Sequence, residues 1–342
     1  MRIKERKIGK DFPPYIIAEA CINHEGKIEI AKEMVYAARY AGADCIKFQM
    51  HVLEDEMLRD TPISENFDES LYDTLNKTNL SVEEHLELKD LCDQIGIDYL
   101  CTPFSFASAD ILHDVLKVPA FKVGSGECTN HPLLRHIASK GKPMIVSTGM
   151  TQQNEVDDII SCLKETKIEF AITHCVSAYP CPYNIVNLGL IPEYSNKYGV
   201  RVGLSDHTIG IYTSLGSIAL GACIVEKHFS LDRTQPGPDH LSSIETEDLK
   251  SLVIGSKAVW QAMGSKRIIH EEEKEIVAWA RESVVSIKPI NKGDLITTEM
   301  IKIKRPSPKE GGIAAKDYKE VLGKKALKDI EKDQQIYWNQ IR

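Results

Sequence analysis

Short, almost wholly apolar runs alternate over the first 265 residues with longer stretches whose apolar residues recur at helical spacing. The eight apolar runs are Tyr15–Ala20, Asp44–Phe48, Asp98–Cys101, Ala120–Val123, Pro143–Ser147, Phe170–His174, Val200–Leu204 and Cys223–Lys227. Strands buried on both faces of a parallel sheet have this composition. The stretches that favour helix are Ile28–Ala41, Val82–Ile95, Ala107–Val115, Pro132–Ser139, Gln153–Lys164 and Thr246–Met263. Eight strand–helix repeats predict an α/β fold, a (β/α)8 TIM barrel spanning residues 1–265.

The pattern changes after this region. Residues 266–282 are charged and helix-like, and we expect them to form a linker. Residues 283–342 contain short strand-like runs separated by turns, which predicts a small β-rich domain. Residues 51–80 are too many for a simple connection after the second strand, so we expect an active-site insertion there. Ser81 followed by Glu84 predicts a capping box at the next helix.

Composition narrows the possible partners and the compartment. The chain has 342 residues and a net charge of −8, which argues against a general nucleic-acid or membrane binder. It shows no signal peptide and no apolar run long enough to cross a bilayer. The nine cysteines are scattered and none forms C-x-x-C, so they indicate neither a zinc knuckle nor a redox pair. We therefore expect a cytoplasmic protein with free thiols.

Polar residues follow seven of the eight predicted strands at the point where each strand ends. They are Lys47, Gln49, Thr102, Lys122, Ser125, Glu127, Ser147, His174, Ser177, Ser205, Asp206, His207 and His228. In this fold the active site lies at the carboxyl ends of the strands. The ring therefore predicts a catalytic site.

His207 and His228 end neighbouring strands, where two imidazoles can share one divalent metal ion and leave positions for water and substrate. The alternative is a pair of hydrogen-bonded core histidines. Two protein ligands alone would suit a weakly held Mn²⁺ or Mg²⁺ better than tightly held zinc.

Lys47 and Lys122 lie inside apolar strands, where an unpaired ammonium is costly. Two such lysines at one barrel mouth predict a doubly anionic ligand, such as a phosphorylated carboxylic acid. Neutral donors would come from Thr102, Ser125, Ser147, Ser177 and Ser205. The alternative is that each lysine pairs with a nearby carboxylate such as Glu19 or Glu127. Glu25 and Glu127 could also move protons or hold sugar hydroxyls, or be solvated loop carboxylates.

An ordered set of short motifs resembles the sialic acid synthases, with their legionaminic and pseudaminic acid relatives, over nearly the full length. The motifs are Ile17-Ala18-Glu19-Ala20, Asn23-His24-Glu25-Gly26, Ile46-Lys47-Phe48-Gln49, Thr102-Pro103-Phe104-Ser105, Phe121-Lys122-Val123-Gly124-Ser125-Gly126-Glu127, Ser147-Thr148-Gly149-Met150, Gly203-Leu204-Ser205-Asp206-His207-Thr208, Glu226-Lys227-His228-Phe229, Pro236-Gly237-Pro238-Asp239 and Lys304-Arg305-Pro306. The C-terminal segment resembles the antifreeze-like (SAF) domain fused to these barrels.

The resemblance implies a phosphoenolpyruvate-dependent N-acetylneuraminate synthase, which joins phosphoenolpyruvate, N-acetylmannosamine and water to give sialic acid and phosphate. It implies a metal on His207 and His228, with Mn²⁺ expected first and Mg²⁺ or Co²⁺ as alternatives. Glu25 would transfer protons. The residues implied to bind phosphoenolpyruvate are Lys47, Thr102, Lys122, Ser125, Ser147 and Ser205, with Ser177 as a partial substitute for a family amide. Those implied to face the sugar are Gln49, Glu127, Tyr179 and Asp239.

Two further implications concern the C-terminal part. Lys274 matches a family lysine near the active site, and Arg305 would enter the barrel of the partner subunit, which implies a domain-swapped homodimer. The chain departs from the family at Val176-Ser177, where Thr-Asn is usual, and at Gln235, where Arg is usual. The acceptor sugar is therefore open between N-acetylmannosamine, favoured by the stretch at 51–57, and the 2,4-diacetamido-2,4,6-trideoxymannose used to make N,N'-diacetyllegionaminic acid. A Schiff-base pyruvate aldolase using Lys122 and a non-catalytic sugar- or ice-binding protein are the rival functions.

Overall fold

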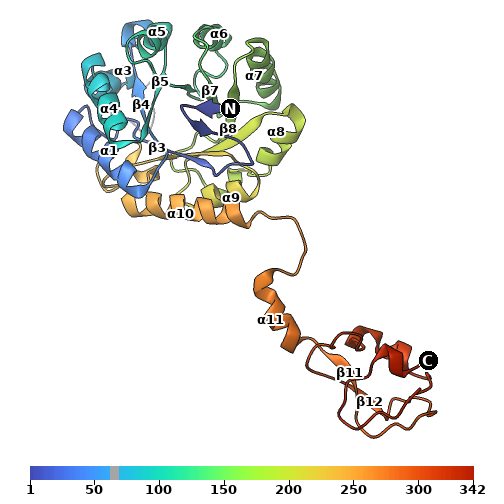
Figure 1. Cartoon of the computed structure of the whole chain (residues 1–342). Coiled ribbons are helices and arrows are strands. Elements are labelled where there is room, and N and C mark those ends of the chain that lie inside the picture. Colours follow the sequence, from blue (N-terminus) through green and yellow to red (C-terminus); the bar gives the residue numbers. More distant parts are fainter. Residues whose placement is uncertain (62–68) are drawn as a thin grey trace. The chain divides into compact units, whose positions relative to one another are not determined.

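The computed structural model describes residues 1–61 and 69–342, and it divides into two compact units, Met1–Gly264 and Ser265–Arg342 (Figure 1). Part of the predicted insertion, residues 62–68, lies outside the described residues. The described part of that segment contains the short helices α2 (Leu53–Glu56) and α3 (Leu71–Thr78).

Eight parallel strands form an almost closed barrel in the first unit, which confirms the predicted fold class. The strands are β3 (Tyr15–Glu19), β4 (Cys45–Met50), β5 (Asp98–Pro103), β6 (Phe121–Val123), β7 (Met144–Ser147), β8 (Phe170–Cys175), β9 (Arg201–Asp206) and β10 (Ile224–His228). Their hydrogen-bonded order is β5-β4-β3-β10-β9-β8-β7-β6. Nearly every strand residue is buried, because one strand face lies inside the barrel and the other packs against helices.

Helices surround the barrel. They are α1 (Ile28–Ala41), α4 (Val82–Ile95), α5 (Phe106–Asp114), α6 (His131–Ser139), α7 (Gln153–Glu165), α8 (Leu190–Tyr198), α9 (Tyr212–Ala219) and α10 (Thr246–Ala262). The predicted capping box of α4 is present: Glu84 N donates to Ser81 Oγ at 3.2 Å, and Ser81 N donates to Glu84 Oε2 at 2.7 Å. Helices α8 and α9 did not stand out from the sequence; both are short, and α9 carries too few polar residues to show a clear amphipathic period.

A two-stranded hairpin, β1 (Arg2–Ile3) with β2 (Arg6–Lys7), lies against the amino-terminal ends of the barrel strands (Figure 1). Ile3 and Ile8 pack in one buried cluster with inward-facing strand residues. These are Tyr15, Ile17, Cys45, Leu100, Ile145, Ala171 and Ile224; the cluster also contains Ala120 and Cys223, which directly precede β6 and β10. The barrel interior is therefore apolar at this end. Inward-facing side chains two residues further along each strand lie closer to the carboxyl-terminal end of the barrel.

The second unit begins with α11 (Glu271–Ala280) and continues with the antiparallel strands β11 (Ser283–Ser286) and β12 (Ile301–Lys304). A short helix α12 (Tyr318–Val321) follows. The core of this unit consists of Val284, Ile290, Ile296, Ile301, Ile313, Val321, Ala326, Ile330, Ile336 and Ile341. The unit is a small fold held by one apolar cluster and isolated bridges, as the short strand-like runs predicted. Among the described residues, no helix is long and apolar enough to cross a membrane.

Gly203 in β9 lies too close to β10 to accommodate a side chain. A Cβ at this position would lie 2.5 Å from the carbonyl oxygen of Ile224 and 2.8 Å from its Cβ. We expect Gly203→Ala to lower the free energy of unfolding by about 1–3 kcal/mol, measured by urea denaturation. Gly189→Ala is the control, because Gly189 has a helical φ of −57° and no heavy atom within 4 Å of an added Cβ. Equal stability of the two variants would contradict the close strand packing.

Candidate active site

Two buried lysines and two buried carboxylates meet inside the barrel, just above the apolar cluster. Lys47 on β4 forms an ion pair with Glu19 on β3, and its Nζ lies 3.9 Å from Glu226 Oε1. Lys122 Nζ on β6 lies 3.5 Å from the same Glu226 oxygen. All four side chains are at most 5% exposed. A single carboxylate on β10 therefore faces both ammonium groups.

From the sequence, the two lysines either await an anionic ligand or pair with nearby carboxylates, and these contacts bear on that choice. Lys47 does pair with Glu19, as the alternative held, but Lys122 faces Glu226 and not Glu127. We did not assign Glu226 a role from the sequence. The signal was its position two residues before His228 in a buried strand, because alternate strand residues share a face.

Burial and neighbouring charge shift the pKa values of this cluster in different directions. Burial, opposed by Lys47 and reinforced by Glu226, raises the pKa of Glu19 to about 7. Against burial, Lys122 and Lys47 hold the pKa of Glu226 below its usual value. Burial lowers the pKa of Lys122. Glu226 is thus ionised at neutral pH, whereas Glu19 titrates near neutrality, so the negative charge that faces the two lysines can decrease when an anion enters.

Hydroxyl groups surround the lysines. Lys47 Nζ donates to Thr102 Oγ1 at 2.9 Å, and Lys122 Nζ donates to Ser147 Oγ at 2.7 Å. Ser205 Oγ donates to Glu226 Oε1 at 3.4 Å. Thr173, which we did not identify from the sequence, lies 2.7 Å from Ser147 between their hydroxyl oxygens.

Ser125 and Ser177 both face Gly149, in the loop after β7. Gly149 N donates to Ser125 Oγ at 3.1 Å, and a Cβ on Gly149 would clash with both serine oxygens. The two serine hydroxyls thus occupy the space that a side chain on Gly149 would need. Ser147, which accepts a hydrogen bond from Lys122, ends the strand that leads to Gly149. The structure thus brings together the hydroxyls predicted to bind the anionic ligand, while that role stays a prediction.

The two histidines lie close enough to share an ion. The ring centroids of His207 and His228 are 5.1 Å apart. His207 Nδ1 lies 2.8 Å from the carbonyl oxygen of Val176; a carbonyl only accepts, so Nδ1 carries the proton and the lone pair is on Nε2. His228 has no hydrogen-bond partner among the described residues. Burial lowers the pKa of His228 well below its usual value, so the ring is neutral at pH 7. Each ring can therefore act as a metal ligand. The alternative of two hydrogen-bonded core histidines does not hold for His228, which has no such partner among the described residues.

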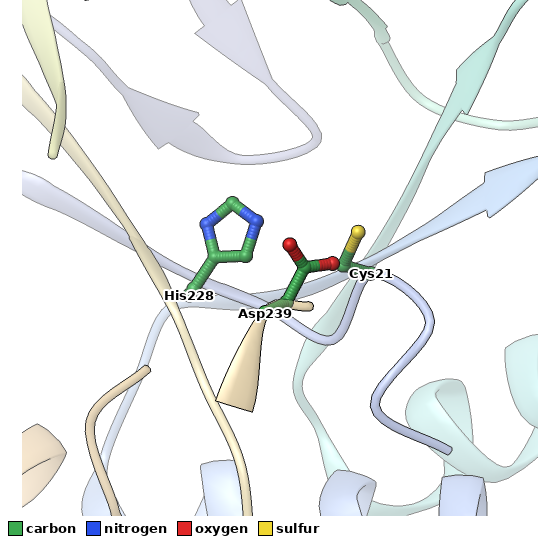
Figure 2. Close-up of side chains that lie close together, drawn as sticks. All are labelled: Cys21, His228 and Asp239. Atoms are coloured by element: carbon green, nitrogen blue, oxygen red, sulfur yellow. The ribbon is translucent and has the colours of Figure 1, made fainter. Parts of the chain in front are cut away.

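Three more groups border the histidines. The Tyr179 ring centroid lies 4.1 Å from that of His207 and 5.5 Å from that of His228. Ligand atoms of Cys21, His228 and Asp239 all lie within 4.8 Å of one another (Figure 2). We did not identify Cys21 as a site residue from the sequence, although Cys21 comes two residues after the end of the first barrel strand.

Gln49 and Glu127 line a pocket of about 380 Å³ next to this centre. Its other walls include the insertion residues Glu56, Met57, Leu71 and Leu75, with His51, Phe104, Gly126 and Asn130. Glu127 Oε2 is buried and has no hydrogen-bond partner among the residues that the structure describes. Burial, and then the charge of Glu56, raise the pKa of Glu127 to about 7. The pocket is therefore only weakly anionic at neutral pH and mixes amide, carboxyl and apolar surface.

Three predicted site residues remain to be described, and one of them, Glu25, lies outside the cluster. Glu25 is in the loop after β3 with a φ of +52°, and its partly exposed carboxylate pairs with Lys27 at 2.7 Å. Lys274 and Arg305 belong to the second unit. There Lys274 pairs with Glu271 at 2.5 Å, and Arg305 Nε donates to the Ala280 carbonyl at 3.1 Å. The roles implied for these three residues stay predictions.

Two family models, several characterised proteins and solved structures match this chain. The family model described as NeuB family matches residues 34–268, and the SAF domain model matches residues 281–342. The chain is 37% identical to the N,N'-diacetyllegionaminic acid synthase of Campylobacter jejuni over 94% of this chain and 98% of the relative. It is 33% identical to the human N-acetylneuraminate-9-phosphate synthase over 97% and 93%. The solved N-acetylneuraminic acid synthetase of Leptospira borgpetersenii superposes with a TM-score of 0.72 and 32% identity, covering 81% of this chain and 94% of that one.

The raised pKa of Glu127 predicts a pH-dependent stability difference. A carboxyl whose folded pKa is near 7 binds protons more tightly in the folded state, so it costs stability as pH rises above about 4.5. We expect Glu127→Gln to gain about 1–3 kcal/mol in unfolding free energy relative to the parent between pH 5 and pH 8. Glu5→Gln is the control, since the Glu5 side chain is 94% exposed. A Glu127→Gln difference that does not change with pH would contradict the buried, unpartnered carboxyl.

Proposed function

Because this chain belongs to the NeuB family, we propose that it is a metal-dependent synthase that condenses phosphoenolpyruvate with an N-acetylated amino sugar and water. The products are a nine-carbon sugar acid and inorganic phosphate. The observation that carries the proposal is the convergence of Lys47 and Lys122, ringed by hydroxyls, beside two imidazoles with free nitrogen atoms.

The lysine cluster supplies the site for phosphoenolpyruvate. Its phosphate and carboxylate would compete with Glu19 and Glu226 for the two ammonium groups. Glu19, with a pKa of about 7, can take up a proton when an anion enters, so the local charge stays compensated. Thr102, Ser147 and the two serine hydroxyls beside Gly149 would then hold the anion and fix the direction of its methylene carbon. Such positioning is a large part of the rate enhancement of a reaction between two bound molecules.

The histidine pair supplies the site for the metal. A divalent ion on His207 and His228 would act as a Lewis acid on the aldehyde oxygen of the open-chain sugar. We propose Mn²⁺ first, with Mg²⁺ and Co²⁺ as alternatives.

The protein then directs bond formation between the two substrates. The methylene carbon of phosphoenolpyruvate attacks the aldehyde carbon, water adds to the enol carbon, and phosphate leaves with cleavage of its carbon–oxygen bond. Lys47 and Lys122 offset charge through both steps. Glu25 exchanges protons at the reacting centre, as the resemblance implies.

The acceptor sugar would occupy the pocket of Gln49 and Glu127. We propose N-acetylmannosamine as the acceptor. The 2,4-diacetamido-2,4,6-trideoxy sugar is a second candidate, supported by the greater identity to a legionaminic acid synthase than to the N-acetylneuraminate-9-phosphate synthase. Met57, Leu71 and Leu75 also favour it, because apolar walls suit a C6 methyl and a second acetamido methyl group.

Phosphate release tests the reaction class and the acceptor together. With phosphoenolpyruvate and Mn²⁺, we expect release with N-acetylmannosamine, abolished by a chelator and reduced at least about 100-fold by His228→Ala. His113→Ala on α5 is the matched control and should retain parental activity, since His113 contacts Asp114 at the surface. Release with the diacetamido sugar alone would assign the chain to the second candidate. No release with either sugar, together with borohydride trapping of pyruvate on Lys122, would contradict the proposal and support an aldolase.

The bond that breaks can be followed in the phosphate product. Phosphoenolpyruvate labelled with ¹⁸O at its bridging oxygen should give phosphate that retains the label, because carbon–oxygen cleavage leaves that oxygen on phosphorus. Mass spectrometry of the phosphate makes the distinction, with inorganic phosphate incubated under the same conditions as the exchange control. Unlabelled phosphate would show phosphorus–oxygen cleavage and refute the mechanism.

A further inference from the structure

A third kind of metal ligand lies beside His228. The Cys21 Sγ, a His228 ring nitrogen and an Asp239 carboxylate oxygen are within 4.8 Å of one another. Figure 2 shows the carboxylate between the imidazole and the thiol. The three residues come from the loop after β3, the end of β10 and the loop that precedes the turn His240–Ser242. Segments far apart in sequence thus converge on one point.

The backbone at Cys21 is unusual for this side chain. Cys21 has a φ of +46°, a left-handed conformation that glycine adopts freely and other residues adopt rarely. The loop is held in place by Asn23, whose Nδ2 donates to the Phe229 carbonyl at 2.9 Å and to Ser243 Oγ at 3.0 Å. Ser243 Oγ in turn donates to the Asp239 carbonyl at 2.7 Å. The conformation therefore aims a thiol at the centre and ties its loop to that of Asp239.

Two further observations point to a ligand at this place, and the first does not involve the thiol. The His228 side chain is only 7% exposed, and its ring nitrogens have no hydrogen-bond partner within the described part of the chain. Gln49 Nε2 donates to Cys21 Sγ at 3.0 Å. A buried imidazole without a partner and a sulfur that accepts an N–H bond are typical of a metal centre with an outer shell of hydrogen bonds.

We infer that Cys21 and Asp239 bind the same divalent ion as His207 and His228, so that the site has four protein ligands. This inference rests on the proposed function for the presence of the ion. Binding would replace the thiol proton, which passes to solvent, with a sulfur–metal bond. A thiolate with two imidazoles and one carboxylate favours borderline ions such as Co²⁺, Fe²⁺ or Zn²⁺ over Mn²⁺ and Mg²⁺, so the inference would move Co²⁺ ahead of Mn²⁺ in the order of metals proposed above.

Cys175 is the other thiol near the histidines, and its geometry does not suit the same role. Its Sγ lies 3.9 Å from His207 Nδ1, the nitrogen that donates its proton to the Val176 carbonyl. It therefore lies on the side of the ring away from the Nε2 lone pair. Cys175→Ser is consequently a matched control for a buried thiol that touches a site histidine without binding the ion.

The test is a Co²⁺ titration of the full-length chain, followed by absorption spectroscopy. A cobalt–thiolate bond gives a charge-transfer band in the near ultraviolet. We expect this band in the parent and in Cys175→Ser, and its loss in both Cys21→Ser and Cys21→Gly. Cys21→Gly relieves the left-handed backbone, so loss of the band in that variant does not come from misfolding. We expect Co²⁺ affinity to fall at least about 10-fold in both variants and Mn²⁺ affinity to fall less, since loss of even an outer-shell partner costs about 10–100-fold.

The outcomes separate this inference from the proposed function. A Cys21→Gly variant that keeps the band and the Co²⁺ affinity would overturn the inference, whatever the parent does with phosphoenolpyruvate. Loss of the band in Cys175→Ser in place of Cys21→Ser would overturn it as well. A parent that shows the band but releases no phosphate with any sugar would support the four-ligand site and contradict the proposed function alone.

Discussion

Compensation of buried charge at the barrel mouth is the constraint on which the rest of this site depends. Lys47 and Lys122 are almost completely buried, and their charge is offset by Glu19 and Glu226 from the two adjacent strands β3 and β10. Removing one member of such a cluster typically leaves an uncompensated charge that costs about 3–5 kcal/mol. The register of four strands and the chemistry of the site are therefore coupled. The same cluster that stabilises the ligand-free barrel provides the cations that an anionic substrate needs.

The inward-facing residues are arranged in layers that follow from strand periodicity. Ile17, Cys45 and Ile224 belong to the apolar cluster closed by the hairpin at the amino-terminal end. Two residues later on the same strands come Glu19, Lys47 and Glu226. Two residues later again come Gln49 on β4 and His228 on β10, while Cys21 lies in the loop after β3. The inward-facing positions thus pass from packing, through charge, to the candidate site. The apolar layer excludes water below the charges and strengthens their interactions.

The part of the site around the two histidines is built from loops as well as strands. His207 and His228 project from strand ends, but Cys21 and Asp239 depend on loops joined through Asn23 and Ser243. Loop residues can adopt backbone conformations that strands cannot, and Cys21 does so. A metal site assembled in this way would gain ligands beyond those that strand ends alone supply, at the cost of a strained backbone position.

The sequence by itself determined the eight strands, most of the helices, the capping box at Ser81 and the set of polar residues at the strand ends. These features depend on local periodicity, and every polar residue after a parallel strand must lie at the same end of the barrel. Only the tertiary structure decided that Lys122 faces Glu226, that a hairpin fills the other end of the barrel and that Cys21 lies beside His228 and Asp239. Each of these contacts joins side chains that are far apart in sequence, so their meeting depends on barrel closure and loop conformation, which no local pattern encodes.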